Sequence, residues 1–162
     1  MPSYEVEHIC PLNESQRDEI AAAITQIHCN VFSATRLFVN VRFTDVSNHH
    51  TYVAGRKAKT NRILANIRWG PARKSSQSDD LCNGILTEWK KIVGSEGDKS
   101  LDTIFVLGSL IGGFERGFLK PQVGCDQEWA AQNLQAFKKL AEAGDQDFQE
   151  LVDAIEGEHA FR

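Results

Sequence analysis

A strand–helix–strand order occurs twice along the chain. In the first copy, a loosely alternating stretch (2–9) precedes a segment with apolar residues at helical spacing, and LFVNVRFTDV (37–46) then alternates strictly. Strict alternation predicts a strand with one buried face, and apolar residues three or four apart predict an amphipathic helix. Asn13 or Ser15 is the expected N-cap of this helix. The apolar stripe comprises Ile20, Ile24, Ile27 and Val31.

The same order returns in the second half of the chain. A strand is predicted over 62–69 and another over 101–110, and Ser76 or Ser78 is expected to cap the helix between them. Residues 47–60 are predicted to form a loop or short hairpin, and two further helices are expected over 128–143 and 147–156, separated by Gly144. The stripe of the second helix comprises Leu81, Ile85, Trp89 and Ile92.

These elements predict an α/β (α+β) fold. Two βαβ units would form a four-stranded mixed sheet with two helices on one face, followed by a C-terminal helical extension. The 162 residues suit a single domain, with a core over about 2–125 and the extension over about 126–156. The second face of the sheet is expected to be apolar and uncovered, which predicts packing against other subunits.

Composition excludes several classes of function. A net charge of −4 gives no global attraction to nucleic acid or to an anionic membrane, although the stretch from Arg56 to Lys74 is locally basic. No run is long and apolar enough to cross a membrane, and no secretory signal opens the chain, so a cytoplasmic protein is expected. The cysteines are far apart without metal-ligand spacing, so neither zinc nor a disulfide framework is indicated. They are Cys10, Cys29, Cys82 and Cys125.

The N-terminal stretch MPSYEVEH places a proline directly after Met1. If Met1 is removed, Pro2 presents a secondary amine that no internal residue can supply. The competing interpretation is that Pro2 merely permits methionine removal or stiffens the chain end. Burial and nearby cations would favour the neutral amine, a base, whereas a wetter pocket or a close carboxylate would keep it protonated as a general acid.

A doubled βαβ unit with an N-terminal proline on its first strand resembles the tautomerase superfamily. Within it, the chain is most similar to the cis-3-chloroacrylic acid dehalogenase group, over roughly the first 130 residues. The likeness rests on MPSYEVEH, on AAAITQIHCN (21–30), on IRWGPAR (67–73) and on FERGFLKPQVGCDQEW (114–129).

The resemblance implies a role for five residues. Pro2 would shuttle a proton, His28 and Glu115 would position or activate water, and Arg68 and Arg73 would hold the substrate carboxylate. Two extra residues lie between these arginines compared with the dehalogenase spacing. Leu107 stands where the dehalogenase carries a tyrosine, which argues against dehalogenation. No metal or organic cofactor is implied.

Each of these side chains also has a plainer interpretation. The arginines could lie in a solvated loop, although the Gly70–Pro71 turn would let two guanidinium groups converge on one carboxylate. His28 lies at the edge of its helix's apolar stripe, as many boundary histidines do. Glu115 could be an exposed loop acid, but in an apolar setting its pKa would rise and make it a usable base.

The resemblance predicts a homotrimeric enzyme acting on a short carboxylic acid that is an enol, a 2-oxo acid or a 2,3-unsaturated acid. Tautomerisation, hydration, dehalogenation and decarboxylation all remain open. One alternative is a non-catalytic oligomeric module that binds nucleic acid through Arg56 to Lys74. The third strand lacks the aromatic, glycine-containing pattern that base stacking requires, and the chain is acidic. Another is a tautomerase fold that has lost its activity.

Overall fold

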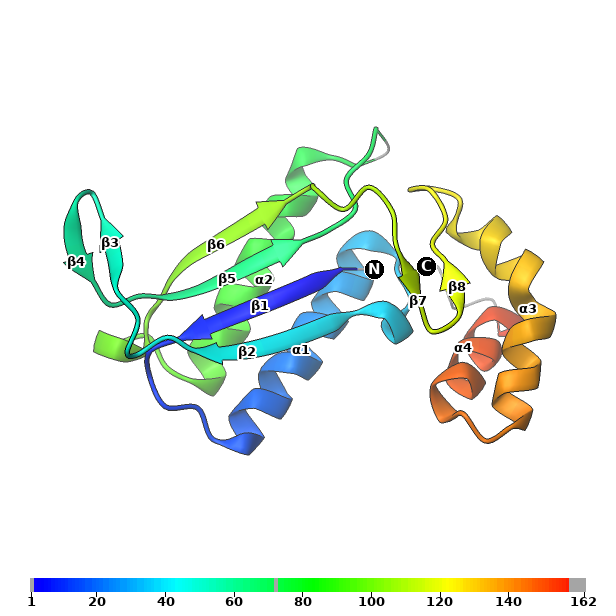
Figure 1. Cartoon of the computed structure of the whole chain (residues 1–162), viewed down its shortest axis with the longest axis horizontal. Coiled ribbons are helices and arrows are strands. Elements are labelled where there is room, and N and C mark those ends of the chain that lie inside the picture. Colours follow the sequence, from blue (N-terminus) through cyan, green and yellow to red (C-terminus); the bar gives the residue numbers. More distant parts are fainter. Residues whose placement is uncertain (1, 72, 158–162) are drawn as a thin grey trace.

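The computed structural model describes residues 2–71 and 73–157. Its centre is a four-stranded sheet in the order β2-β1-β5-β6, in which β1 and β5 are antiparallel and the two outer pairs are parallel (Figure 1). The mixed sheet of two βαβ units predicted from the sequence is therefore confirmed. Its strands are β1 (Ser3–His8), β2 (Asn40–Asp45), β5 (Asn61–Asn66) and β6 (Leu101–Leu107).

Two long helices, α1 (Glu14–Phe32) and α2 (Ser75–Ile92), cover one face of this sheet (Figure 1). The predicted cap of α1 is confirmed, because the Asn13 side chain accepts the backbone N–H of Gln16 at 2.8 Å. The main core lies between these helices and the sheet. Its largest fully buried side chains include Tyr4, Val6, Ile24, Ile63, Ile67, Leu81 and Trp89.

The predicted caps of α2 are wrong. The helix begins at Ser75, so Ser76 and Ser78 lie inside its first turn. The Gln77 side chain accepts the backbone N–H of Lys74 at 2.9 Å. The glutamine in the first turn thus satisfies the N–H of the cap residue, and no serine side chain caps this helix.

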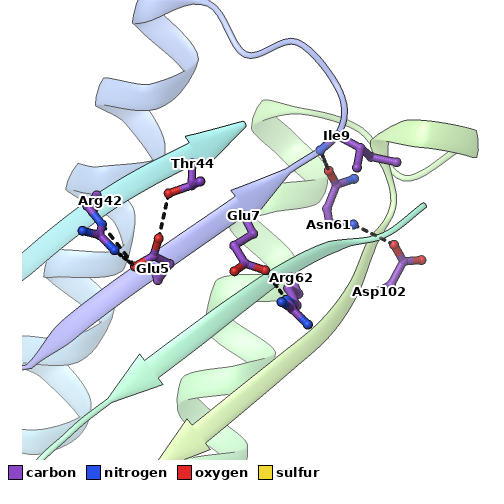
Figure 2. Close-up of polar contacts among 8 residues, drawn as sticks. All are labelled: Glu5, Glu7, Ile9, Arg42, Thr44, Asn61, Arg62 and Asp102. Carbon is purple, nitrogen blue, oxygen red and sulfur yellow. Dashed lines mark hydrogen bonds and ion pairs between the residues drawn. The ribbon is translucent and has the colours of Figure 1, made fainter. Parts of the chain in front are cut away.

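The uncovered face of the sheet is charged at its centre, so the expectation of an apolar face is wrong. The alternation of β1 places Tyr4 and Val6 under the helices and sends Glu5 and Glu7 to the other face. Strand register sets Glu5 beside Arg42 and Glu7 beside Arg62, and both pairs form ion pairs (Figure 2). Thr44 also donates to Glu5 at 2.7 Å. Exposed apolar side chains on this face lie on β6, at Phe105 and Leu107.

Short elements lie at both ends of the sheet (Figure 1). Residues 47–60 contain the hairpin β3–β4, as predicted, at the end remote from the N-terminus. The predicted strand 37–46 starts later, because its first residues belong to the 3-10 turn η1. The hairpin β7–β8, with strands two residues long, was not predicted. The bounds are η1 (Arg36–Phe38), β3 (Thr51–Val53), β4 (Arg56–Ala58), η2 (Gly97–Lys99), β7 (Phe114–Glu115) and β8 (Phe118–Leu119).

The C-terminal helices α3 (Asp126–Glu142) and α4 (Gln146–Glu156) form a second hydrophobic cluster. Gly144 separates them in a left-handed conformation (φ 96°), which glycine adopts without strain. The buried members of this cluster are Phe137, Phe148, Leu151 and Val152, and Leu37 and Phe118 pack against them. The N-terminal end of β1 lies on the side of the sheet that is nearer to α3 and α4 (Figure 1).

The basic residues between positions 56 and 74 do not form one surface. Arg56 lies on the β3–β4 hairpin, and Arg62 pairs with Glu7 on the open sheet face. Arg68 and Arg73 follow the end of β5 and line a cavity beyond the opposite end of the sheet from that hairpin. The fold therefore separates the charges that the nucleic-acid alternative requires to be together.

Candidate active site

Pro2 is buried at the start of β1, and its carbonyl accepts the backbone N–H of Asn40 at 3.1 Å. This bond fixes the residue to the neighbouring strand. Met1 lies outside the described residues, so the state of the Pro2 nitrogen stays a prediction.

Pro2 borders a small cavity of about 30 Å³. That volume holds only a few water molecules. The structure brings four of the five residues proposed from the sequence to this cavity, from β1, α1 and the segment between β5 and α2. They are Pro2, His28, Arg68 and Arg73.

His28 is held in one orientation by Tyr4. The Tyr4 hydroxyl lies 2.6 Å from His28 Nδ1, and both residues are buried. Burial raises the pKa of Tyr4, so its proton is retained. Within the described part of the chain, Nδ1 is the one hydrogen-bond acceptor that Tyr4 has, so we assign the proton to the Tyr4–Nδ1 bond. His28 then carries its own proton on Nε2.

The His28 imidazole is neutral. Burial, followed by the positive charges of Arg73 and Arg68, lowers its pKa to about 3. A neutral imidazole with Nε2–H is a hydrogen-bond donor at physiological pH. His28 can therefore stabilise an oxyanion or orient a water molecule, but it holds no proton on Nδ1 to transfer.

This burial predicts a pH dependence of stability. Between the ordinary histidine pKa of 6.5 and the folded value of about 3, the unfolded chain binds a proton that the folded chain does not. The free energy of unfolding therefore decreases as the pH falls below 6.5. Urea denaturation at pH 7 and pH 5 should show wild type losing about 2 kcal/mol more than His28→Gln. Equal losses in both proteins would contradict a buried neutral His28.

Arg73 has hydrogen-bonding capacity left for a ligand. Its Nη1 donates to the Phe32 carbonyl at 3.1 Å, and the guanidinium lies 4.3 Å from the centre of the Phe32 ring. The buried Nε atom has no partner among the described residues. Burial lowers the pKa of Arg73, and the positive charge of Arg68 acts in the same direction. A bound carboxylate would supply the missing acceptor and the opposite charge.

Arg68 is already engaged. Its Nη2 donates to Asp126 Oδ1 at 2.7 Å, and its Nη1 donates to the Pro121 carbonyl. Only 12% of the Arg68 side chain is exposed. Both proposed arginines therefore line the cavity, but Arg68 ties the start of α3 to the end of the sheet and is neutralised by Asp126.

Glu115 lies outside the cavity lining. Asn40 donates to its Oε1 at 2.8 Å, and its Oε2 lies 3.5 Å from Lys120 Nζ. Lys120 is itself a lining residue, so it stands between Glu115 and the cavity. Any effect of Glu115 on a ligand would pass through this lysine.

Lys120 is the functional candidate that sequence reasoning missed. It follows β8 in the apolar stretch GFLKPQVG, and its side chain is only 2% exposed. Burial lowers its pKa to about 7. The available signal was a single lysine among apolar residues, the same criterion that singled out Glu115.

Leu107 also lies outside the cavity lining of this chain. It sits at the end of β6 with 40% of its surface exposed. Its carbonyl accepts the N–H of Ile67, which joins the two strand ends beside the site. The Leu107 side chain has no hydrogen-bond donor.

Within residues 2–71 and 73–157, no three His, Cys, Asp or Glu side chains cluster in a way that could hold a metal ion. None of the helices in the same ranges has the length and apolar character required to span a bilayer.

Comparison with known proteins places the chain in a family. The family model Tautomerase_3, described as "Putative oxalocrotonate tautomerase enzyme", matches residues 1–134. The solved structure of N1, a member of the cis-3-chloroacrylic acid dehalogenase family, has a TM-score of 0.67 and 28% identity. The match covers 86% of this chain and 99% of N1. No curated protein matches the sequence.

Two more distant structures share the fold. RhCC from Rhodococcus jostii RHA1 has a TM-score of 0.60 and 17% identity, over 81% of this chain and 96% of RhCC. The symmetric trimer called Q0 fused 4-OT wild type has a TM-score of 0.57 and 13% identity, over 72% of this chain and 94% of the other. At these identities the likeness shows the fold alone. With a family model covering 134 residues and the doubled βαβ sheet in place, the chain belongs to the tautomerase superfamily, in a family whose structural relatives include the cis-3-chloroacrylic acid dehalogenase group.

Proposed function

We propose that this protein is an enzyme that uses the Pro2 amine to move a proton on a small carboxylic acid. The substrate class is an enol, a 2-oxo acid or a 2,3-unsaturated acid. One observation carries the proposal: Pro2, a neutral His28 and the incompletely paired Arg73 all line one buried cavity. Together they offer a base, an oxyanion donor and a cation for the carboxylate.

In this proposal Pro2 acts as the base. Once Met1 is removed, the amine would be buried beside the positive charge of Arg73, and both effects disfavour the ammonium form. The neutral amine would take the enol hydroxyl proton and deliver a proton to carbon. His28 Nε2–H would stabilise the developing oxyanion.

Arg73 would hold the substrate carboxylate. Arg73 lines the cavity, and its Nε has no hydrogen-bond partner among the described residues. Arg68 would act on the substrate less directly, by holding Asp126 and the loop before α3 against the site.

We also propose that the chain assembles as a homotrimer. The Q0 fused 4-OT structure, which shares the fold, is named as a symmetric trimer. The open sheet face supports this arrangement, because its charges are paired within the chain and its β6 edge exposes Phe105 and Leu107. Burying paired charges between subunits costs less desolvation free energy than burying unpaired charges.

A cytoplasmic location completes the proposal. All four cysteines are free thiols, both the buried Cys10 and the exposed Cys125. Reduced cysteines are typical of proteins in reducing compartments.

The test is a comparison of two reactions. Ketonisation of the enol of phenylpyruvate should be measurable by ultraviolet absorbance, because it needs only the amine, a donor and the carboxylate site. Release of halide from cis-3-haloacrylate should be slow or absent, because Leu107 supplies no hydroxyl at the position of the dehalogenase tyrosine. Absence of ketonisation would refute the proposed function, and rapid halide release would show that Leu107 does not limit the chemistry.

A further inference from the structure

The surroundings of Lys120 are unusual for a lysine. Its Nζ contacts the face of the Phe38 ring and lies 5.4 Å from the centre of the Trp129 ring. The Nζ atom is buried and has no hydrogen-bond partner among the described residues, and Glu115 is 3.5 Å away. The lysine nevertheless borders the same cavity as Pro2 and Arg73. The amine is thus enclosed by aromatic rings, on a side chain that forms part of the cavity wall.

Lys120 forms an ion pair with Glu115 at 3.5 Å, and the burial of Nζ outweighs the effect of this pair on its pKa. Glu115 is negative and Arg68 is positive, while Asp126 is already paired with Arg68. The Glu115–Lys120 separation is too long for a good hydrogen bond, and both facing atoms lack a better partner. A buried donor left without an acceptor costs free energy, so the arrangement favours loss of the proton from Nζ.

We propose that Lys120 is a second reactive amine of the site and forms an imine with carbonyl compounds bound in the cavity. The ligand class is a short 2-oxo acid, whose carboxylate Arg73 would hold. This assignment rests on the proposed function for its substrate class and adds a covalent step to it. Lysines desolvated in apolar pockets are the usual imine-forming residues of enzymes.

In the formation of the imine, Glu115 accepts a proton from Lys120 and later returns it. The Lys120 ammonium passes one proton to Glu115, and the freed lone pair forms a bond to the carbonyl carbon while the carbonyl π electrons move to oxygen. The new bond leaves two protons on nitrogen, and one of them passes to the negative oxygen to give the hydroxyl. Glu115 then returns its proton to nitrogen, nitrogen passes it to the hydroxyl, and water leaves while nitrogen forms the double bond. The net change is an ammonium and a ketone giving a protonated imine and water.

The experiment is reductive trapping with pyruvate and sodium cyanoborohydride, followed by intact mass and tryptic mapping. Trypsin does not cut before Pro121, so Lys120 and any adduct on it lie in the peptide 117–138, whereas the Pro2 amine lies in 2–17. Lys120 should be labelled at least ten times faster than Lys138, a lysine that pairs with Glu156 on the protein surface. The labelling rate should be half-maximal near pH 7, as the pKa of about 7 requires.

Three variants test whether the adduct forms on Lys120 and whether Glu115 assists its formation. Lys120→Arg keeps the charge and should remove the adduct from the 117–138 peptide, and Glu115→Gln should slow labelling at least tenfold. Lys138→Arg should leave labelling of Lys120 unchanged. Adducts confined to the Pro2 peptide, or labelling of Lys120 no faster than that of Lys138, would overturn the assignment. The second comparison uses wild type alone, so it does not depend on whether a variant folds.

The two proposals fail in different ways. Ketonisation without labelling of Lys120 would leave the proton-transfer enzyme intact and remove the imine. Labelling of Lys120 without ketonisation would refute the tautomerase and retain the reactive lysine.

Discussion

Pro2→Ala is expected to lower kcat for ketonisation by a factor of about 100 or more, the usual size of a general-base contribution. Alanine offers a primary amine with a different basicity and without the ring that restrains the nitrogen. The fold should persist, because the contact that fixes Pro2 uses its carbonyl, which alanine retains. Steady-state kinetics with circular dichroism would check both points.

Retention of Met1 gives a sharper version of the same experiment. In such molecules the proline nitrogen is an amide and has no basicity, so they should be inactive. Intact-mass analysis of protein from the source cell identifies the fraction that begins at Pro2. Activity that does not follow this fraction, or full activity in a preparation with Met1 wholly retained, would rule out the amine as the proton carrier.

Arg73→Ala is expected to weaken binding of a carboxylic acid substrate by roughly 2 kcal/mol, or about 30-fold in KM. The reason is the loss of a charged donor whose Nε has no other partner in the described structure. Arg73→Lys should recover little, because an ammonium cannot reproduce the planar geometry of the guanidinium. Unchanged kcat and KM in both variants would show that Arg73 does not contact the substrate.

Arg68 should behave differently, and Asp126 provides the control. Arg68→Ala leaves the Asp126 carboxylate uncompensated at the cavity, so it should weaken anion binding through repulsion. Asp126→Asn in the Arg68→Ala background should then recover much of the loss. A double variant as impaired as Arg68→Ala alone would instead indicate direct contact between Arg68 and the substrate.

Sequence patterns predicted the sheet and its helices well for a physical reason. Alternation and helical spacing are local properties, and the core stripes Ile20/Ile24 and Leu81/Ile85 follow them directly. The charged sheet face was missed because it depends on register between strands. Glu5 and Arg42 are 37 residues apart, and each looks like an ordinary exposed residue until the strands pair.

In the candidate site, too, short sequence motifs indicated some residues, whereas contacts between distant segments could not be predicted. The family resemblance indicated Pro2, His28 and Arg73, and the fold places these side chains on one cavity. Their catalytic roles stay predictions. The Arg68–Asp126 pair spans 58 residues, and the position of Lys120 between Glu115 and the cavity depends on the β7–β8 hairpin. No local pattern encodes either contact.

The second hydrophobic cluster has a consequence for how new specificities could arise. Pro2 and His28 are anchored in the βαβ core, whereas Lys120, Asp126 and Trp129 belong to the segment that leads into α3 and its own cluster. Substitutions in that segment would alter the wall facing the substrate without removing contacts from the main core. Libraries confined to residues 119–124, which leave Phe118, Asp126 and Trp129 in place, should therefore change the substrate range with only a small decrease in melting temperature.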